Sequence, residues 1–285
     1  SGILMDSGSE PWGKHGTDGF WEKTVSIAKR QHIRHKILDL ETLKSRFPAF
    51  QVEPSGKVYW EEEAGFLRPE VAIRAQLDLA QKNEAEILVN IPVEGIRKEG
   101  DSILILTKDR QISAEKVLIS AGGWIRDFLQ EEEKSKFKIC RQVLHWLEIE
   151  PGFTDWTAYP VWMWGFGPKP EDFIYGFPSL DGRTVKMASE SFVDLKHPDF
   201  LNREVNPEEQ DQFWKEKVEG KILGLKPNVV KSVVCFYTVT SDARFVVKPL
   251  AEMDNVLLAS ACSGHGFKHS AALGERLALE LLGKH

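Results

Sequence analysis

The sequence has few cysteines, no long apolar run and no excess of basic residues. Its three cysteines, spread over 285 residues, are too few and too scattered for a disulfide framework or a Cys-x-x-Cys zinc site. No apolar run approaches the roughly 20 residues that cross a bilayer, and the first residues lack the basic and then apolar pattern of a signal peptide. A net charge of −6 and a pI near 5.8 argue against nucleic acid or an anionic membrane as the main partner. We therefore expect a cytoplasmic protein.

Nucleotide-binding motifs are also missing. No Gly-x-Gly-x-x-Gly follows a strand with an acidic residue about 20 positions later, so the dinucleotide fingerprint is absent. Gly8 to Lys14 imitates the Gly-x4-Gly-Lys spacing of a phosphate-binding loop, but His15 stands where Ser or Thr would hold magnesium. Pro11 also removes one N–H group that would cradle phosphate. We interpret this stretch as a surface loop.

The chain is long enough and apolar enough, at 42% hydrophobic residues, to bury a substantial core. Apolar spacing and capping residues predict helices at 18–29, 40–47, 69–81, 207–223 and 273–282. β-branched and alternating runs predict strands at 3–5, 57–61, 86–89, 93–98, 102–107, 116–120, 139–150, 161–166, 173–177, 184–189, 229–240, 245–247 and 255–261. The order indicates a mixed chain, with an α/β framework at both ends and a mostly antiparallel β insert between them.

The most informative stretch is Ser263-Gly264-His265-Gly266-Phe267-Lys268. It lies between a predicted strand and a predicted helix, a geometry that leaves backbone N–H groups and a positive dipole end facing a ligand. The glycines let the backbone approach something flat or anionic, and Lys268 adds a full positive charge. Taken alone, Gly-x-Gly before a helix fits a plain turn equally well.

A second turn has the same character. Ser120-Ala121-Gly122-Gly123-Trp124 follows the nearly all-apolar strand at 116–120, which we expect to be buried on both faces. Small residues at this point permit close approach of the backbone to a ligand. A tight strand-to-helix turn without a ligand is equally compatible with the pattern.

Two sequence strings, read as a whole, indicate a protein family much more specifically than their glycines alone. Ser-Gly-His-Gly-Phe-Lys at 263–268, with Cys-Phe-Tyr-Thr-x-Thr-x-Asp at 235–242, closely resembles the monomeric sarcosine oxidase and N-methyltryptophan oxidase family. This family consists of FAD-dependent amine oxidases in the D-amino-acid-oxidase-like superfamily. The resemblance spans nearly the whole chain and continues at 2–4, 64–69, 93–96, 121–124, 140–143 and 175–178.

The resemblance implies a fold class and a domain division. We expect an α/β (mixed α+β) chain with an incomplete FAD-binding, Rossmann-like domain formed by residues 1–135 and 228–285. The family's N-terminal dinucleotide-binding βαβ unit, of at least about 30 residues, is absent from the sequence. Residues 136–227 are expected to form a mostly antiparallel β-sheet substrate domain with flanking helices, to which part of 1–62 contributes.

The resemblance also implies cofactor-binding residues. Cys235 corresponds to the position that bears a thioether link to the flavin, whereas composition alone favours a small apolar core residue. Val93 matches the segment that contacts the adenosine part of FAD. The flavin-side turn and the motif near the end of the chain supply the other expected contacts, at Ala121, Gly122, Trp124, Gly264, His265, Gly266, Phe267 and Lys268.

Four residues are expected to act on the substrates. By resemblance Lys186 helps oxygen react, because a fixed cation stabilises developing negative charge, and Lys268 binds the substrate carboxylate. Tyr175 and Tyr237 would orient the substrate amine through their hydroxyl groups. On the residues alone, a solvated lysine and a structural core tyrosine are the ordinary alternatives.

A metal site is not expected. His265 and His269 stand four residues apart, but no third ligand has a helpful spacing. His265 is expected to support the turn or the flavin edge instead.

Two positions depart from the family pattern. Glu190 stands where the family has an active-site histidine, and Ala271 where a proline is usual. The first change puts an acid where a neutral or cationic ring is expected, so the favoured substrate is expected to differ from sarcosine.

The function expected from the resemblance is oxidation of the C–N bond of a secondary or N-methyl amino acid by O2, giving an imine and H2O2. This chain alone is expected to bind FAD poorly or not at all, and a separate chain could supply the missing unit. One alternative is a non-catalytic small-molecule-binding module or subunit, which the missing fingerprint favours. Another is a glycine oxidase or amino-acid dehydrogenase of the same fold, to which the two motifs are less similar.

Overall fold

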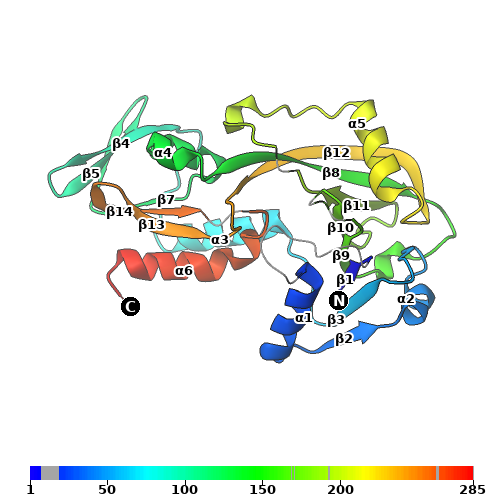
Figure 1. Ribbon diagram of the computed structural model, residues 1–285. Coiled ribbons are helices and arrows are strands. Elements are labelled where there is room, and N and C mark those ends of the chain that lie inside the picture. Colours follow the sequence, from blue (N-terminus) through cyan, green and yellow to red (C-terminus); the bar gives the residue numbers. More distant parts are fainter. Residues whose placement is uncertain (8–18, 168, 170, 192, 261–262, 285) are drawn as a thin grey trace. The chain divides into compact units, whose positions relative to one another are not determined.

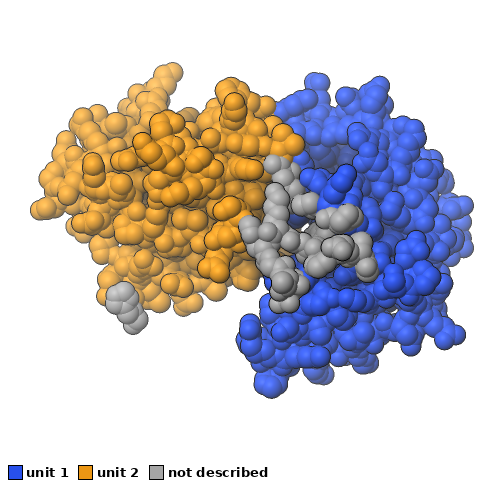
Figure 2. Space-filling view, in the orientation of Figure 1, with its two compact units in different colours: residues 1–66, 141–192, 202–235 blue, residues 67–140, 193–201, 236–285 orange. Residues whose placement is uncertain are grey.

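The computed structural model describes residues 1–7, 19–167, 169, 171–191, 193–260 and 263–284 (Figure 1). The surface loop expected at 8–15 lies outside these residues. The chain divides into two compact units (Figure 2). Unit 1 contains residues 1–66, 141–192 and 202–235, and unit 2 contains residues 67–140, 193–201 and 236–285. The last boundary falls within one strand, between Cys235 and Phe236.

Unit 1 is built on an eight-stranded sheet of order β12-β8-β11-β10-β9-β1-β3-β2. Neighbouring strands whose register is described run antiparallel, except the parallel pair β1 and β9. The mostly antiparallel sheet expected from the alternating sequence pattern is therefore present. The strands are β1 (Gly2–Asp6), β2 (His35–Leu38), β3 (Lys57–Glu61), β8 (Lys138–Ile149), β9 (Val161–Gly165), β10 (Phe173–Gly176), β11 (Thr184–Ser189) and β12 (Leu225–Val239).

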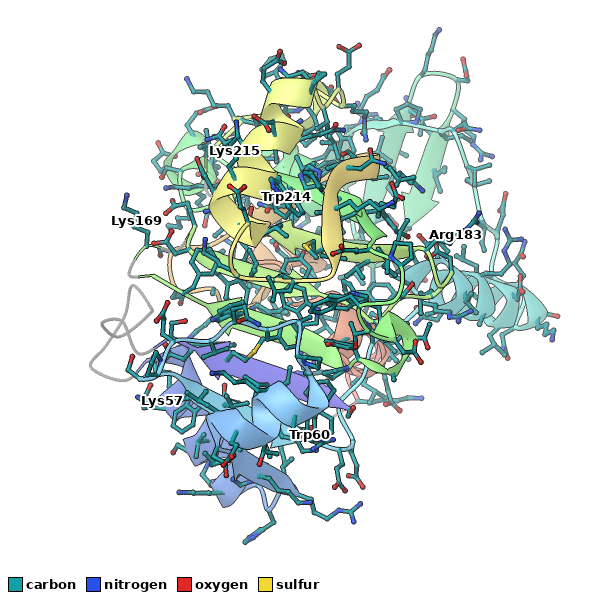
Figure 3. The ribbon with its side chains drawn as sticks, turned by 90° about the vertical axis from the view of Figure 1, so that its right-hand side faces the viewer. Lys57, Trp60, Lys169, Arg183, Trp214 and Lys215 are labelled. Carbon is teal, nitrogen blue, oxygen red and sulfur yellow. The ribbon has the colours of Figure 1, made fainter. Side chains whose placement is uncertain are left out.

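The two faces of this sheet differ, because successive side chains of a strand point to opposite sides. One face buries a core that includes Trp162, Trp164 and Met187 and packs against helices α2 (Leu40–Arg46) and α5 (Pro207–Phe213). Lys57 and Trp60 on β3, and Trp214 and Lys215 just after α5, are labelled in Figure 3. The opposite face is covered at β1 and β3 by α1 (Phe20–Arg30), which packs Val25 and Ala28 against it.

Unit 2 contains two smaller sheets. The sheet of order β13-β14-β7 consists of β13 (Val246–Leu250), β14 (Met253–Ser260) and β7 (Val117–Ile119). The sheet of order β4-β5-β6 consists of β4 (Val93–Glu99), β5 (Ser102–Thr107) and β6 (Gln111–Ala114). Ile103, Ile119, Ile125 and Leu258 are members of its buried core.

The helices of unit 2 are α3 (Pro69–Lys82), α4 (Glu131–Lys134) and α6 (Ser270–Leu281), with 3₁₀ helices η1 (Gly122–Phe128), η3 (Pro198–Phe200) and η5 (Phe267–His269). Unit 1 adds the 3₁₀ helix η2 (Trp156–Ala158) and the π-helical segment η4 (Trp214–Val218). Helix α3 buries none of its residues. Among the described residues, no helix combines the length and the apolar character that crossing a membrane requires.

Several predicted elements are confirmed, and the errors have physical reasons. Asp39 caps α2 by accepting a hydrogen bond from the Thr42 N–H at 2.7 Å, as its place before the apolar run indicated. The strand expected at 86–89 is wrong, since the structure places no strand there although Leu88 and Val89 are apolar and exposed. The helix expected at 207–223 ends at Val218, and strands β2 and β6 were not predicted.

The expectation that strand 116–120 is buried on both faces is also wrong. Its counterpart β7 forms the edge of its sheet, and Leu118 is 36% exposed. Apolar composition alone does not reveal which strand of a sheet lacks a neighbour.

Candidate functional site

Two glycine turns follow the carboxyl ends of neighbouring strands in the β13-β14-β7 sheet. β7 and β14 are parallel neighbours, with Val117 opposite Val256 and Ile119 opposite Leu258. The carboxyl ends of both strands therefore point the same way. The turn at Gly122 follows β7, and the motif from Ser263 onwards follows β14. In open α/β sheets, ligands bind outside the carboxyl ends of the strands.

Thr238, near the end of β12, ties the two turns together. Its hydroxyl donates a hydrogen bond to the Gly122 carbonyl oxygen at 3.3 Å, and its own carbonyl accepts one from the Ser263 N–H at 2.6 Å. The side chain is fully buried. Thr238 belongs to the Cys-Phe-Tyr-Thr motif, but no role was predicted for it, because a hydroxyl on a strand indicates no partner by itself.

The backbone at Gly264 lies directly against an aromatic ring. Its φ is +80°, and a Cβ atom there would come within 3.2 Å of Tyr237 Cζ. The conformation therefore favours glycine, and a Cβ atom would fit only if the Tyr237 ring moved by a few tenths of an ångström. The next residue, His265, forms a hydrogen bond between Nε2 and the Ala243 carbonyl at 2.8 Å, and its ring stacks on Phe245 at 5.2 Å. Both contacts of His265 support the turn.

Replacing Gly264 by alanine should test this geometry. A left-handed alanine costs about 1–2 kcal/mol, and displacement of the Tyr237 ring adds to that cost, so the urea midpoint should fall. Gly274 of α6 is the matched control, because it lies in a helix and a Cβ there meets nothing within 4 Å. Gly274→Ala should stabilise the protein by about 0.5–1 kcal/mol. Equal effects of the two substitutions would contradict the turn geometry.

Unit 1 carries a separate group of predicted residues on neighbouring strands of its sheet. Lys186 on β11 lies opposite Trp146 of β8, and Tyr175 on β10 lies opposite Ala188. The Lys186 ammonium lies 5.2 Å from the Trp146 ring centroid and 5.1 Å from that of Phe177. Both rings attract the cation through their π faces. Lys186 is thus held in place by aromatic side chains, an arrangement that was not predicted from the sequence.

Tyr175, Cys235, Lys186 and Glu190 influence one another electrostatically. Burial raises the pKa of the Tyr175 hydroxyl, and negative charge at Cys235 and Glu190 raises it further. Burial likewise raises the pKa of the Cys235 thiol, while the nearby Lys186 cation partly opposes the shift. Near neutral pH this face therefore presents a phenol that can donate a hydrogen bond, a protonated thiol and a fixed cation.

The structure brings many of the predicted site residues together within each unit. In unit 2, Ala121, Gly122 and Trp124 belong to one turn, and Gly264, His265, Gly266, Phe267 and Lys268 to the other. Tyr237 of β12 packs against Gly264, and Thr238 hydrogen-bonds to both turns. Lys268 is exposed and Gly266 is buried. Val93 begins β4 in the other sheet of unit 2, and no hydrogen bond described for this part of the chain joins it to the turns. The functional roles of all these residues remain predictions.

The arrangement in unit 2 can accept a flat or anionic ligand. Gly122 has a φ of +56°, and its outer side is open, since a Cβ atom there would meet no described atom within 4 Å. The turns thus offer accessible backbone at the edge where ligands bind to such sheets. Within the described ranges, no three His, Cys, Asp or Glu side chains gather closely enough to hold a metal ion.

Comparisons with known sequences identify relatives over most of the chain. A family model described as "FAD dependent oxidoreductase" (DAO) matches residues 11–279. A monomeric sarcosine oxidase of Bacillus sp. (strain NS-129) is 30% identical over 280 residues, covering 97% of this chain and 71% of the relative. An N-methyl-L-tryptophan oxidase of Citrobacter koseri is 27% identical, covering 90% of this chain and 67% of the relative.

A solved structure shows the same fold. A variant of NikD, described as an unusual amino acid oxidase essential for nikkomycin biosynthesis, superimposes with a TM-score of 0.74. The match covers 93% of this chain and 69% of NikD at 14% sequence identity. At this identity the likeness concerns the fold alone.

Proposed function

The chain belongs to the FAD dependent oxidoreductase (DAO) family, and we propose that it oxidises the C–N bond of a secondary or N-methyl amino acid, with O2 as the electron acceptor. Sarcosine oxidase and N-methyl-L-tryptophan oxidase relatives support this substrate class. The observation that carries the proposal is that Thr238 joins two glycine turns, one after each of two parallel strands, at the carboxyl ends of those strands.

The residues of unit 2 fit FAD. The open turn at Gly122 and the Gly264 turn offer close approach of the backbone at the edge of the sheet. If FAD is bound there, it would supply the two-electron redox chemistry of amine oxidation by O2. The protein's own contribution is to bind, orient and provide charge.

Three polar side chains, Lys268, Tyr175 and Tyr237, would bind and orient the substrate. Lys268, exposed at the start of the C-terminal helical segment, would bind the substrate carboxylate as a point charge. Tyr175 is protonated near neutral pH, and burial raises the pKa of its hydroxyl further, so it would donate a hydrogen bond to orient the substrate amine. Tyr237, packed against Gly264, would complete the orientation.

Two further residues of unit 1 would serve the cofactor and oxygen. Cys235 is the position for covalent attachment of the flavin, and its thiol is protonated near neutral pH because burial raises its pKa. Lys186, held over Trp146 and Phe177, would stabilise the negative charge that develops on O2.

We also propose that a dinucleotide-binding βαβ unit, supplied upstream or by another polypeptide, completes unit 2. Helix α3 buries none of its residues, although four of them are large and apolar. These are 44–63% exposed to solvent: Val71, Ile73, Leu77 and Leu79. β7 is an edge strand in the described sheet. A helix with so much exposed apolar surface gains little stability by itself, and an unpaired parallel edge accepts another strand. The sarcosine oxidase relative is correspondingly longer than the region matched, which covers 71% of it.

Residues 1–285 alone should therefore bind FAD weakly, and adding the βαβ unit should restore binding together with oxidase activity. FAD occupancy is measured from visible absorbance per polypeptide, and activity from H2O2 released with sarcosine, N-methyl-L-tryptophan or glycine. Activity only with glycine would replace the N-methyl substrate class by that of glycine oxidases. Full FAD occupancy of residues 1–285 alone would contradict the need for a further unit.

A further inference from the structure

The 3₁₀ helix η1 is held by side chains of the segment 193–201. Trp124 donates a hydrogen bond from Nε1 to Asp199 Oδ1 at 3.1 Å, and Arg126 Nη1 lies 3.3 Å from Asp194 Oδ1. The carboxylate of Asp127, in the same short helix, lies 3.2 Å from His197 Nε2. Short 3₁₀ helices have poor internal hydrogen-bond geometry, so these three contacts do much to fix the position of η1.

His197 connects two of these contacts. The backbone N–H of Asp199 donates to His197 Nδ1 at 3.2 Å, so Nδ1 acts as an acceptor. In the neutral ring the proton then lies on Nε2, where it is donated to Asp127. The His197 ring thus links Asp127, near the end of η1, to the backbone of Asp199, whose side chain accepts the hydrogen bond from Trp124.

The same segment supports the glycine turn at the start of η1. A Cβ atom on Gly123 would lie 2.5 Å from the Phe236 ring and 2.8 Å from Pro198 Cγ, so both residues pack directly against this backbone. The Trp124 ring meets Phe236 edge to face, with centroids 5.5 Å apart and an interplanar angle of 81°. Trp124 is nevertheless 41% exposed, and its orientation depends on the bond to Asp199.

From these contacts we propose that His197 and Asp199 are positioning residues for the cofactor-side turn. They fix the Trp124 indole and the Gly122–Gly123 backbone in the orientation that receives the cofactor, and they act through Trp124 and Asp127 without touching it. The inference rests on the proposed FAD function. Neither residue stands out in the sequence, because the segment that contains them lies about 70 residues from η1.

The test uses the complete protein, including the βαβ unit, with isotope-labelled tryptophan and glycine. Asp199→Ala removes the acceptor of the indole N–H, and the variant should fold because the Asp199 side chain is 67% exposed. In NMR spectra without FAD, the Trp124 indole signal, assigned with Trp124→Phe, and the Gly122 amide signal should both shift. FAD affinity should fall about tenfold, the change expected if the hydrogen bond from Trp124 to the Asp199 carboxylate supplies most of the preference for the orientation that binds the cofactor.

Conservative variants separate positioning from general stability. Asp199→Asn keeps an acceptor oxygen and should restore both signals and most of the FAD affinity. His197→Asn keeps an acceptor near the position of Nδ1 and should perturb the turn less than His197→Ala. Asp109→Ala, in the exposed turn between β5 and β6, is the matched control and should change neither measurement.

Unchanged Trp124 and Gly122 signals in Asp199→Ala would overturn the inference, because the hydrogen bond would then hold nothing. Shifted signals with unchanged FAD affinity would overturn the cofactor role. If the wild-type protein binds no FAD, the proposed function fails. In that case the NMR signals alone test whether Asp199 positions the turn: unchanged Trp124 and Gly122 signals in Asp199→Ala would overturn this claim as well.

Discussion

Replacing Lys186 by methionine should slow the reaction of the reduced enzyme with O2 by about 100-fold or more, the usual effect of removing a preorganised group that stabilises developing charge. Methionine keeps much of the side-chain length but removes the cation. Anaerobic reduction by the amino-acid substrate should change far less, since this step does not place negative charge on oxygen. Stopped-flow absorbance, with reduction and reoxidation measured separately, distinguishes the two steps.

A neighbouring lysine provides the control. Lys231 on β12 also lies over Trp146, with its ammonium 4.8 Å from the ring centroid, but it is exposed to solvent. Lys231→Met therefore removes a cation from the same ring while leaving Lys186 in place. Reoxidation should remain close to the wild-type rate in this variant. If both variants lose the same fraction of the rate, the effect belongs to the general charge of this face and the role of Lys186 is wrong.

Cys235→Ser should abolish covalent attachment of the flavin completely. Serine has nearly the same size as cysteine, but it lacks the sulfur that forms the thioether. After denaturation and precipitation of the complete protein, flavin colour should stay with the wild-type polypeptide and appear in the supernatant for the variant. Intact mass spectrometry should show the corresponding loss of the mass of FAD.

Cys140 supplies the matched control for this measurement. It is fully buried in β8, and burial raises the pKa of its thiol to about 11. Cys140→Ala should keep covalent flavin, although loss of packing can lower the stability of the protein. Covalent flavin that persists in Cys235→Ser would place the attachment elsewhere. A wild-type protein that releases all its flavin would show that the cofactor is bound without a covalent link.

The elements that the sequence predicted well are those governed by local physics. Asp39 before a short apolar run marked the start of α2, and Pro69 marked the first turn of α3. The alternating runs that became β8 to β11 were recognisable because one face of their sheet packs its side chains into the main core of unit 1, while the side chains of the other face lie outside that core.

The errors concern features that depend on partners distant in the sequence. Residues 86–89 have the composition of a strand but no strand in the structure, and β7 has the composition of a central strand but lies at an edge. In both cases the amino-acid composition reflects the side chains, whereas the pairing of a strand depends on which other segment of backbone lies next to it in the sheet.

The sequence by itself determined the family, through the strings at 235–242 and 263–268, and with it the cofactor and the class of chemistry. Those residues could be recognised because both strings keep a specific order of residue types at fixed short spacings. Only the tertiary structure decided that Thr238 joins the two turns, that Trp146 and Phe177 hold Lys186, and that His197 and Asp199 hold Trp124. Apart from the hydrogen bond between the Asp199 N–H and His197, which lie two residues apart, these contacts connect residues that are 9 to 116 positions apart, so no local pattern could predict them.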